Sequence, residues 1–144
     1  MRNFLVVLSI LAFLLAFYIY LSYSHLSPRV RAKRSHLTSA LVRAGYQPNY
    51  WMISGYRPPW LNRLMPLSAK KSDHQRGLAI DLWVGDVNND WRWTDADVQI
   101  VAKAIDKMDD RDPANQGGLG MYHKTWAPRM VHFDVSGRRR HWDN

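Results

Sequence analysis

Cysteine is absent from the 144 residues of this chain. Its absence excludes disulfide bonds, cysteine-based zinc fingers and thiol nucleophiles. It does not indicate a redox compartment, because a chain without cysteine folds equally well in either. Internal repeats and low-complexity segments are also missing, and the length leaves room for one small domain behind an apolar N-terminus.

Acidic residues are outnumbered, with 12 Asp and Glu against 20 Lys and Arg, for a formal charge of +8. A basic surface favours an anionic partner, such as nucleic acid, membrane lipid or an acidic wall polymer. No RNP-like or helix-turn-helix pattern is present, so we expect no nucleic-acid partner. The basic run Arg138–Arg140 suits an anionic wall, and it is equally typical of a solvated tail.

A long apolar run opens the chain. Phe4–Tyr20 carries no charge, and about twenty such residues cross a bilayer as a helix. Tyr18, Tyr20 and Tyr23 cluster at its C-terminal end, as aromatic residues do at a membrane interface. A buried core helix is disfavoured, because so small a domain can hardly surround a helix that is apolar on all sides. Residues 1–24 are therefore predicted to be a transmembrane anchor or a signal peptide.

Two further details concern the fate and orientation of this segment. Ser22-Tyr23-Ser24 has small residues at the spacing of a cleavage site, in which case the domain is secreted; the length of the apolar run favours an uncleaved anchor. Arg2 precedes the run, and four basic residues follow it: Arg29, Arg31, Lys33 and Arg34. The positive-inside tendency therefore favours a cytoplasmic domain, whereas the substrate argument below favours a domain outside the cytoplasm.

The remaining pattern predicts a compact α+β domain at residues 35–144, behind a basic linker at residues 25–34. Ser35 is expected to cap a short helix through Ala44, and Thr94 opens the most strongly periodic helix. Residues 60–71 are expected to be irregular. Four strands are predicted, at Tyr50–Ser54, Leu78–Val84, Gly117–Tyr122 and Met130–Val135.

Two short segments carry the residues that point to chemistry. His74 and Asp81 lie seven positions apart, with Gly77 between them, and His132 is followed two residues later by Asp134. Two imidazoles and one carboxylate are what a catalytic zinc ion needs from a protein, with the fourth position open to water. Each residue alone has an ordinary explanation, since a single His is more often structural and an Asp often caps a turn.

Strand geometry indicates how these residues can meet. Alternate side chains of a strand share a face, so His132 and Asp134 lie on one face of the last strand. If the strand that holds Asp81 is its neighbour, Asp81 and His132 converge, and His74 enters from the preceding loop. The glycine at 77 permits a close approach there.

Five motifs occur in order along the chain: Ser54–Pro58, Ser72–Asp81, Gly117–Tyr122, Val131–Asp134 and Arg140–Trp142. The set resembles the M15-type zinc D-Ala-D-Ala peptidases, and most closely their compact branch of murein endopeptidases, once called a domain of unknown function. The resemblance covers roughly residues 35 to 142.

The resemblance implies a small antiparallel sheet with flanking helices, one Zn²⁺, and cleavage of peptide bonds in peptidoglycan stems or cross-links. It implies His74, Asp81 and His132 as the metal ligands. It also implies a cleft in which Arg57 holds the substrate carbonyl or carboxylate, with Ser72 and Tyr122 beside it. A wall-binding module that keeps the fold and the zinc but lacks turnover is the alternative.

The chain departs from this family pattern at the catalytic base. Several relatives place Glu, Asp or His shortly before the last ligand, where this chain has Trp126, Ala127, Pro128, Arg129 and Met130. The remaining candidates are Asp134 and His123. Asp134 is equally suited to be the base or to orient a ligand imidazole, and His123 is expected to be exposed.

Overall fold

The computed structural model describes residues 2–65, 68–123 and 128–144. Its α-helices and strands, in chain order, are α1 (Arg2–Ser24), α2 (Pro28–Arg43), β1 (Tyr50–Ser54), α3 (Pro59–Leu64), β2 (Ala79–Val84), α4 (Asp95–Arg111), β3 (Gly118–Tyr122), β4 (Met130–Asp134) and β5 (Arg140–Asp143). Two 3₁₀ turns, η1 (Asp73–Arg76) and η2 (Pro113–Asn115), lie before β2 and β3. The α+β class is confirmed.

The five strands form one mixed sheet in the order β1-β2-β4-β3-β5. Three pairings are antiparallel, as the resemblance implied, but β5 runs parallel to β3. The reason is topological. The chain reverses once after β4, at a turn where Gly137 has a φ of 81°, and both edges of β4 are already paired. The last strand joins the free edge of β3, and because β3 is antiparallel to β4, a strand that reverses from β4 runs in the same direction as β3.

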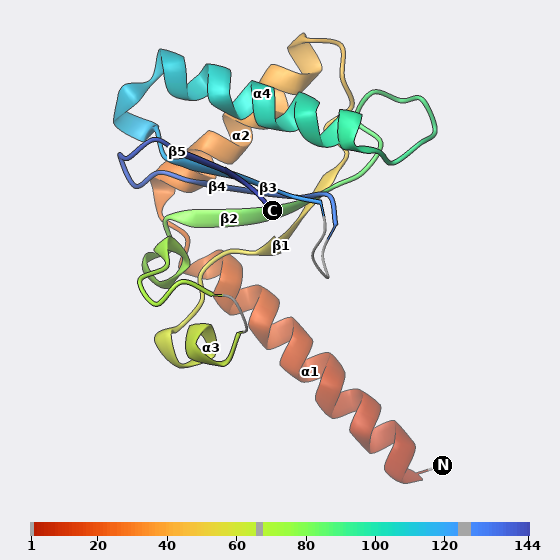
Figure 1. Cartoon of the computed structure of the whole chain (residues 1–144). Helices are drawn as coiled ribbons and strands as arrows, with labels where there is room; N and C mark the ends of the chain where they lie inside the picture. Colours follow the sequence, from red (N-terminus) through yellow and green to blue (C-terminus); the bar gives the residue numbers. More distant parts are fainter. Residues whose placement is uncertain (1, 66–67, 124–127) are drawn as a thin grey trace.

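One face of the sheet holds the hydrophobic core. Figure 1 shows α2 and α4 together on that face. Side chains from two strands and both helices are fully buried there: Ile80, Leu82, Val84, Val131, Phe133, Val30, Leu37, Val98, Val101 and Ile105. Because strand side chains alternate, Asp81 and His132 point to the other face. That second face carries the candidate site.

The predicted start of the first domain helix was wrong. α2 begins at Pro28, and the Ser27 hydroxyl accepts a hydrogen bond from the amide of Val30 as its N-cap. Most of the predicted basic linker is thus helical. Lys33 is buried on the inner face of α2, where it forms an ion pair with Asp109 of α4 at 2.5 Å.

The second predicted helix is confirmed, with Thr94 as the N-cap of α4 and Asp97 completing a capping box. The short helix α3 lies within the stretch expected to be irregular. It starts at Pro59, where a fixed φ and a missing N–H suit the first helical position.

The N-terminal helix α1 extends away from the domain (Figure 1). Asn3–Ser24 includes an 18-residue window with a mean hydropathy of 2.7 and is long and apolar enough to cross a membrane, as an anchor or a signal sequence. Its C-terminal part contacts the domain: Tyr18 donates a hydrogen bond to the Ser54 hydroxyl at 3.3 Å, and Ser22 is buried.

Candidate metal centre

His74, Asp81 and His132 converge in one buried cluster, as the sequence predicted. Asp81 Oδ1 lies 3.2 Å from His74 Nε2 and 2.8 Å from His132 Nδ1, and the two imidazole nitrogens are 3.3 Å apart. Three ligand atoms so close, of types that bind divalent metals, form a group that can hold a metal ion.

The fold brings each ligand from a different element. Asp81 in β2 and His132 in β4 are directly opposite in the antiparallel register, which confirms the predicted neighbouring strands. His74 comes from the turn η1, which Ser72 caps by accepting from the His74 amide. Gly77 ends this turn with φ at 65°, and a Cβ there would lie 2.1 Å from the backbone oxygen of His25.

Each imidazole uses its second nitrogen to fix its orientation. His74 Nδ1 lies 2.6 Å from the carbonyl oxygen of Gly55. Because a carbonyl only accepts, Nδ1 must carry a proton, so Nε2 is the ring nitrogen that faces the cluster. His132 presents Nδ1 to the cluster, and its Nε2 lies 3.4 Å from Asp134 Oδ2.

Asp134 therefore lies behind a ligand, on the side of His132 away from the cluster. It is fully buried, and it also accepts from the Ser136 amide at 2.9 Å and from Arg140 at 2.9 Å. Of the two roles that the sequence left open, this arrangement favours orientation of the imidazole over proton transfer to a substrate.

The cluster is strongly polarised. Burial acts to raise the pKa of Asp81, but the charge on His74 and hydrogen bonds with both histidines outweigh it and hold that pKa well below its usual range. Burial acts to lower the pKa of His132, but hydrogen bonds with Asp134 and Asp81 raise it to about 9. Without metal, a proton on His132 therefore neutralises part of the negative charge at neutral pH.

Arg57 lies beside the metal ligands. It follows β1, and its guanidinium is 3.4 Å from Asp81 Oδ2 and donates to the Ser68 hydroxyl at 3.1 Å. Its backbone amide donates to the carbonyl of His74 at 3.0 Å, which ties the loop to η1. The buried Nε has no hydrogen-bond partner among the described residues. A charged group is thus held at the edge of the cleft.

A cleft of about 540 Å³ opens over the cluster. Its lining includes all three predicted ligands and the predicted substrate-binding residues Arg57, Ser72 and Tyr122. The Tyr122 hydroxyl accepts from the Trp142 indole at 2.9 Å, and burial raises its pKa. Trp142 packs on Gly120, where a Cβ would lie 2.3 Å from the indole. Ser72 serves mainly to cap the ligand-bearing turn.

Sequence reasoning missed other residues of this cleft, including Asp73 and Tyr18. Arg140 links Asp73 and Asp134, at 3.0 and 2.9 Å, so the basic run is not merely a solvated tail. The motif that ends in Trp142 was the only signal for this link. Asp73 lies inside the His74 motif without a pattern of its own, and Tyr18 looked only like a membrane residue.

His123 is the other candidate for the base, and residues 126–130 take the positions where several relatives place theirs. His123 contacts Asp95 and Asp143, at 2.9 and 3.1 Å, and is not among the residues that line the cleft. Trp126 and Ala127 lie outside the described residues. The described lining contains two carboxylates, and both are engaged: Asp81 in the cluster, and Asp73 with Arg140. Asp134 lies behind His132 and is itself paired with Arg140.

The end of α1 is joined to the loop that orients His74. The Ser22 hydroxyl accepts from the Gly55 amide at 3.0 Å, and the Ser22 carbonyl accepts from the Tyr56 amide at 2.9 Å. A Cβ at position 55 would lie 2.5 Å from that carbonyl oxygen. The last turn of the apolar helix is thus part of the structure that supports the site.

Comparison of the chain with protein-family models, with curated proteins and with solved structures found no match. Its function is therefore inferred from the chemistry of the site.

Proposed function

We propose that this chain is a membrane-anchored zinc peptidase that hydrolyses peptide bonds in peptidoglycan, with its domain outside the cytoplasm. The observation that carries the proposal is the buried set of His74, Asp81 and His132 at the base of an open cleft. Two imidazoles and one carboxylate, with access from one side, are the ligand set of many hydrolytic zinc sites.

The spacing of the ligand atoms supports zinc. Tetrahedral ligands about 2.0–2.1 Å from a zinc ion lie about 3.4 Å from one another. The three separations here are 2.8, 3.2 and 3.3 Å, so little movement is needed to accept the ion. When bound, zinc supplies Lewis acidity that activates water at neutral pH.

The surrounding side chains have complementary tasks. Arg57 offers a fixed cationic donor for a substrate carbonyl or carboxylate. Burial raises the pKa of Tyr122, so its phenol stays protonated at neutral pH and can donate to the same group. Asp134 holds the His132 ring in place through Nε2.

The assignment of substrate and side rests on the motif resemblance and on the apolar helix. Peptidoglycan stems offer peptide bonds and free carboxylates, which Arg57 and the formal charge of +8 suit. Such a substrate lies outside the cytoplasm, and we place the domain there. This orientation of α1 is opposite to the one that the positive-inside tendency of the basic residues after it favours.

A wall-binding module without turnover is the second candidate. It is favoured by one observation: among the described residues that line the cleft, the one carboxylate besides Asp81 is that of Asp73, which is paired with Arg140 and so is not a ready base. In that case the zinc would support a binding surface.

The two candidates are separated by one set of assays on the full chain in detergent. Zinc content is measured by elemental analysis, retention on purified sacculi by sedimentation, and cleavage by mass spectrometry of released fragments. A peptidase binds zinc and releases peptides. A binding module binds zinc and sediments with sacculi but releases nothing, and a chain that does neither contradicts both.

A further inference from the structure

We propose that the exposed tryptophans beside the cleft and in the loop before α4 form a seat on the lipid bilayer surface, beside the point where α1 leaves the membrane. This inference rests on the proposed membrane anchoring of α1. The tryptophan face is defined here by Trp51, Trp83, Trp91 and Trp93, which are 51, 37, 88 and 52% exposed.

Three of the four tryptophans, at 51, 83 and 93, lie together next to the cleft. Trp51 in β1 and Trp83 in β2 are paired in register, and Trp83 follows Asp81 on the same side of its strand. The ring of Trp93 is 6.2 Å from that of Trp51. Arg129 stacks on Trp83 and Trp93, at 5.9 and 5.3 Å from the ring centres. Since Trp83 also lines the cleft, the patch and the metal cluster share one side of the molecule.

The loop before α4 is built to hold Trp91 outward. Asn89 and Trp91 have positive φ values of 60° and 66°, a conformation that side chains other than glycine rarely adopt. Buried Asp86 stabilises it by accepting from the amides of Asp90 and Trp91, at 3.1 and 2.8 Å. The loop therefore adopts an unfavourable backbone conformation, which the buried Asp86 carboxylate stabilises. In this conformation the apolar ring of Trp91 lies almost fully in solvent.

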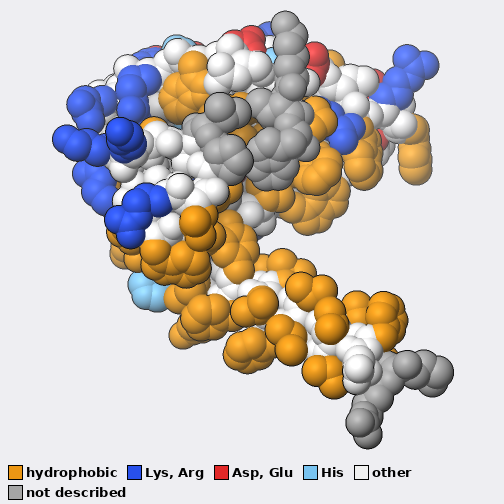
Figure 2. All heavy atoms as spheres, turned by 60° about the horizontal axis from the view of Figure 1, so that its bottom comes forward, with side chains coloured by type: hydrophobic (Ala, Val, Ile, Leu, Met, Phe, Trp, Pro, Cys, Tyr) orange, Lys and Arg blue, Asp and Glu red, His pale blue; other side chains and the backbone are white. Residues whose placement is uncertain are grey.

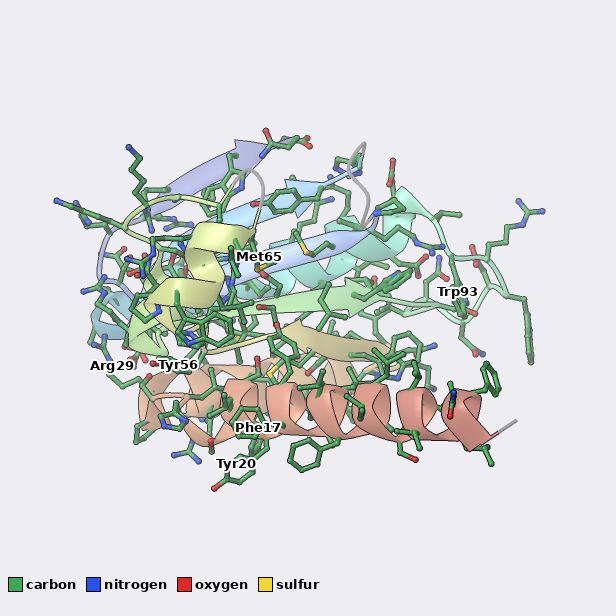
Figure 3. The ribbon with its side chains drawn as sticks, turned by 90° about the horizontal axis from the view of Figure 1, so that it is seen from below. Phe17, Tyr20, Arg29, Tyr56, Met65 and Trp93 are labelled. Atoms are coloured by element: carbon green, nitrogen blue, oxygen red, sulfur yellow. The ribbon has the colours of Figure 1, made fainter. Side chains whose placement is uncertain are left out.

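The direction of α1 indicates what covers this surface. α1 lies on the site face, opposite α2 and α4, and leaves obliquely (Figure 1). Seen from below, the helix runs toward the end of the domain that carries Trp93 (Figure 3). Figure 2 shows hydrophobic side chains gathered on the underside of the domain, on the side from which α1 projects. A bilayer crossed by α1 therefore approaches the domain at its tryptophan-bearing end.

The chemistry of the patch fits a lipid interface. Tryptophan is enriched at the level of lipid headgroups, where its apolar ring is buried and its N–H stays hydrated. The guanidinium of Arg129 above two of the rings suits the phosphates of that layer. With the domain seated this way, the cleft takes peptides held close to the membrane surface.

The absence of cysteine makes a direct test practical. Single-cysteine variants Trp91→Cys and Trp93→Cys are labelled with a nitroxide, and the full chain is placed in nanodiscs of phosphatidylcholine and phosphatidylglycerol. Val42→Cys is the matched control, because Val42 is 56% exposed on α2, which packs on the other face. Ile10→Cys, in the middle of α1, reports insertion of the helix.

The readout is the accessibility of each label to oxygen and to a water-soluble nickel chelate. We expect the labels at 91 and 93 to show interfacial depth, the label at 42 to be aqueous and the label at 10 to lie in the bilayer core. Labels at 91 and 93 as water-accessible as the label at 42 would overturn the seat while leaving the anchor intact.

Two other outcomes would also overturn the lipid seat. A water-accessible label at 10 would overturn the anchor and the seat together. If the labels at 91 and 93 are protected only after muropeptides are added, the face binds wall material and the lipid seat is wrong. The depth measurement needs neither zinc nor turnover, so its result is independent of whether the chain is a peptidase.

Discussion

The hydroxyl of Ser22, at the end of the apolar helix α1, accepts a hydrogen bond from the amide of Gly55, 3.0 Å away. The carbonyl of the same glycine accepts from Nδ1 of His74 at 2.6 Å. The last turn of α1 is therefore two hydrogen bonds away from a candidate metal ligand. Cleavage after Ser24 would disconnect this turn from the chain, which favours a retained helix.

Ser22→Ala should weaken both stability and metal binding. The change leaves the buried amide of Gly55 without its acceptor, at a cost of about 1–3 kcal/mol in the free energy of unfolding. Because Gly55 orients His74, we also expect zinc affinity to fall several-fold. Denaturant unfolding and zinc titration of the full chain in detergent measure the two effects. Ser9→Ala, an exposed serine of α1 bonded to the Leu5 carbonyl, is the control and should change neither. Identical behaviour of the two variants would show that α1 does not support the site.

Asp134→Asn separates orientation from proton transfer. The carboxylate contacts Nε2 of His132 from behind, so its loss should weaken zinc binding by about tenfold or more. Zinc affinity and turnover at saturating zinc are measured on the same variant. Asp95→Asn, at an exposed position on α4, is the control. Unchanged zinc affinity with turnover about a hundredfold lower would instead identify Asp134 as the base.

Arg57→Lys should keep zinc but lose turnover. The guanidinium reaches Asp81 and Ser68 at once, an arrangement that a single ammonium group cannot reproduce. We expect peptide release from sacculi to fall by about a hundredfold, the size typical of a lost oxyanion donor. Retained turnover with normal zinc content would assign Arg57 a purely structural role.

Zinc binding should depend on pH through His132. Its pKa of about 9 in the metal-free protein means that the ring carries a proton at pH 7, which an incoming ion must displace. Affinity should therefore rise about tenfold per pH unit as pH approaches 9, with about one proton released at pH 7. Calorimetry in buffers of different ionisation enthalpy counts that proton, and zero release would contradict the pKa.

The same group affects the stability of the metal-free protein. The pKa of His132 is higher in the folded chain than the ordinary value of 6.5, so folding favours the protonated ring. The resulting stabilisation is fully present below about pH 6.5 and is lost as pH rises through about 9. Denaturant unfolding of the metal-free chain across this range should show the decline, and His132→Ala should reduce it.

The three ligands were predictable because their signals are local. Asp81 and His132 lie on strands whose alternating pattern is clear, and strand pairing then places them opposite each other. His74 lies close enough in sequence to Asp81 that only the intervening turn had to be inferred. The alternation also separates the core face from the site face.

Other parts depend on contacts between distant segments. The burial of Lys33 requires Asp109, so a basic stretch that looked like a linker became part of α2. β5 has no apolar alternation, and it forms because β3 has a free edge. The packing of Ser22 on Gly55 has no sequence signal, since the glycine is explained equally well by a turn.

The most direct test of the account is the release of new amino groups from purified sacculi by the zinc-loaded full chain, compared with His132→Ala. The account predicts that the wild-type chain releases amino groups at a rate that a chelator abolishes and added zinc restores. It also predicts that His132→Ala, folded by circular dichroism, releases none. Zinc-loaded wild-type protein that binds sacculi but releases no amino groups would contradict the peptidase assignment.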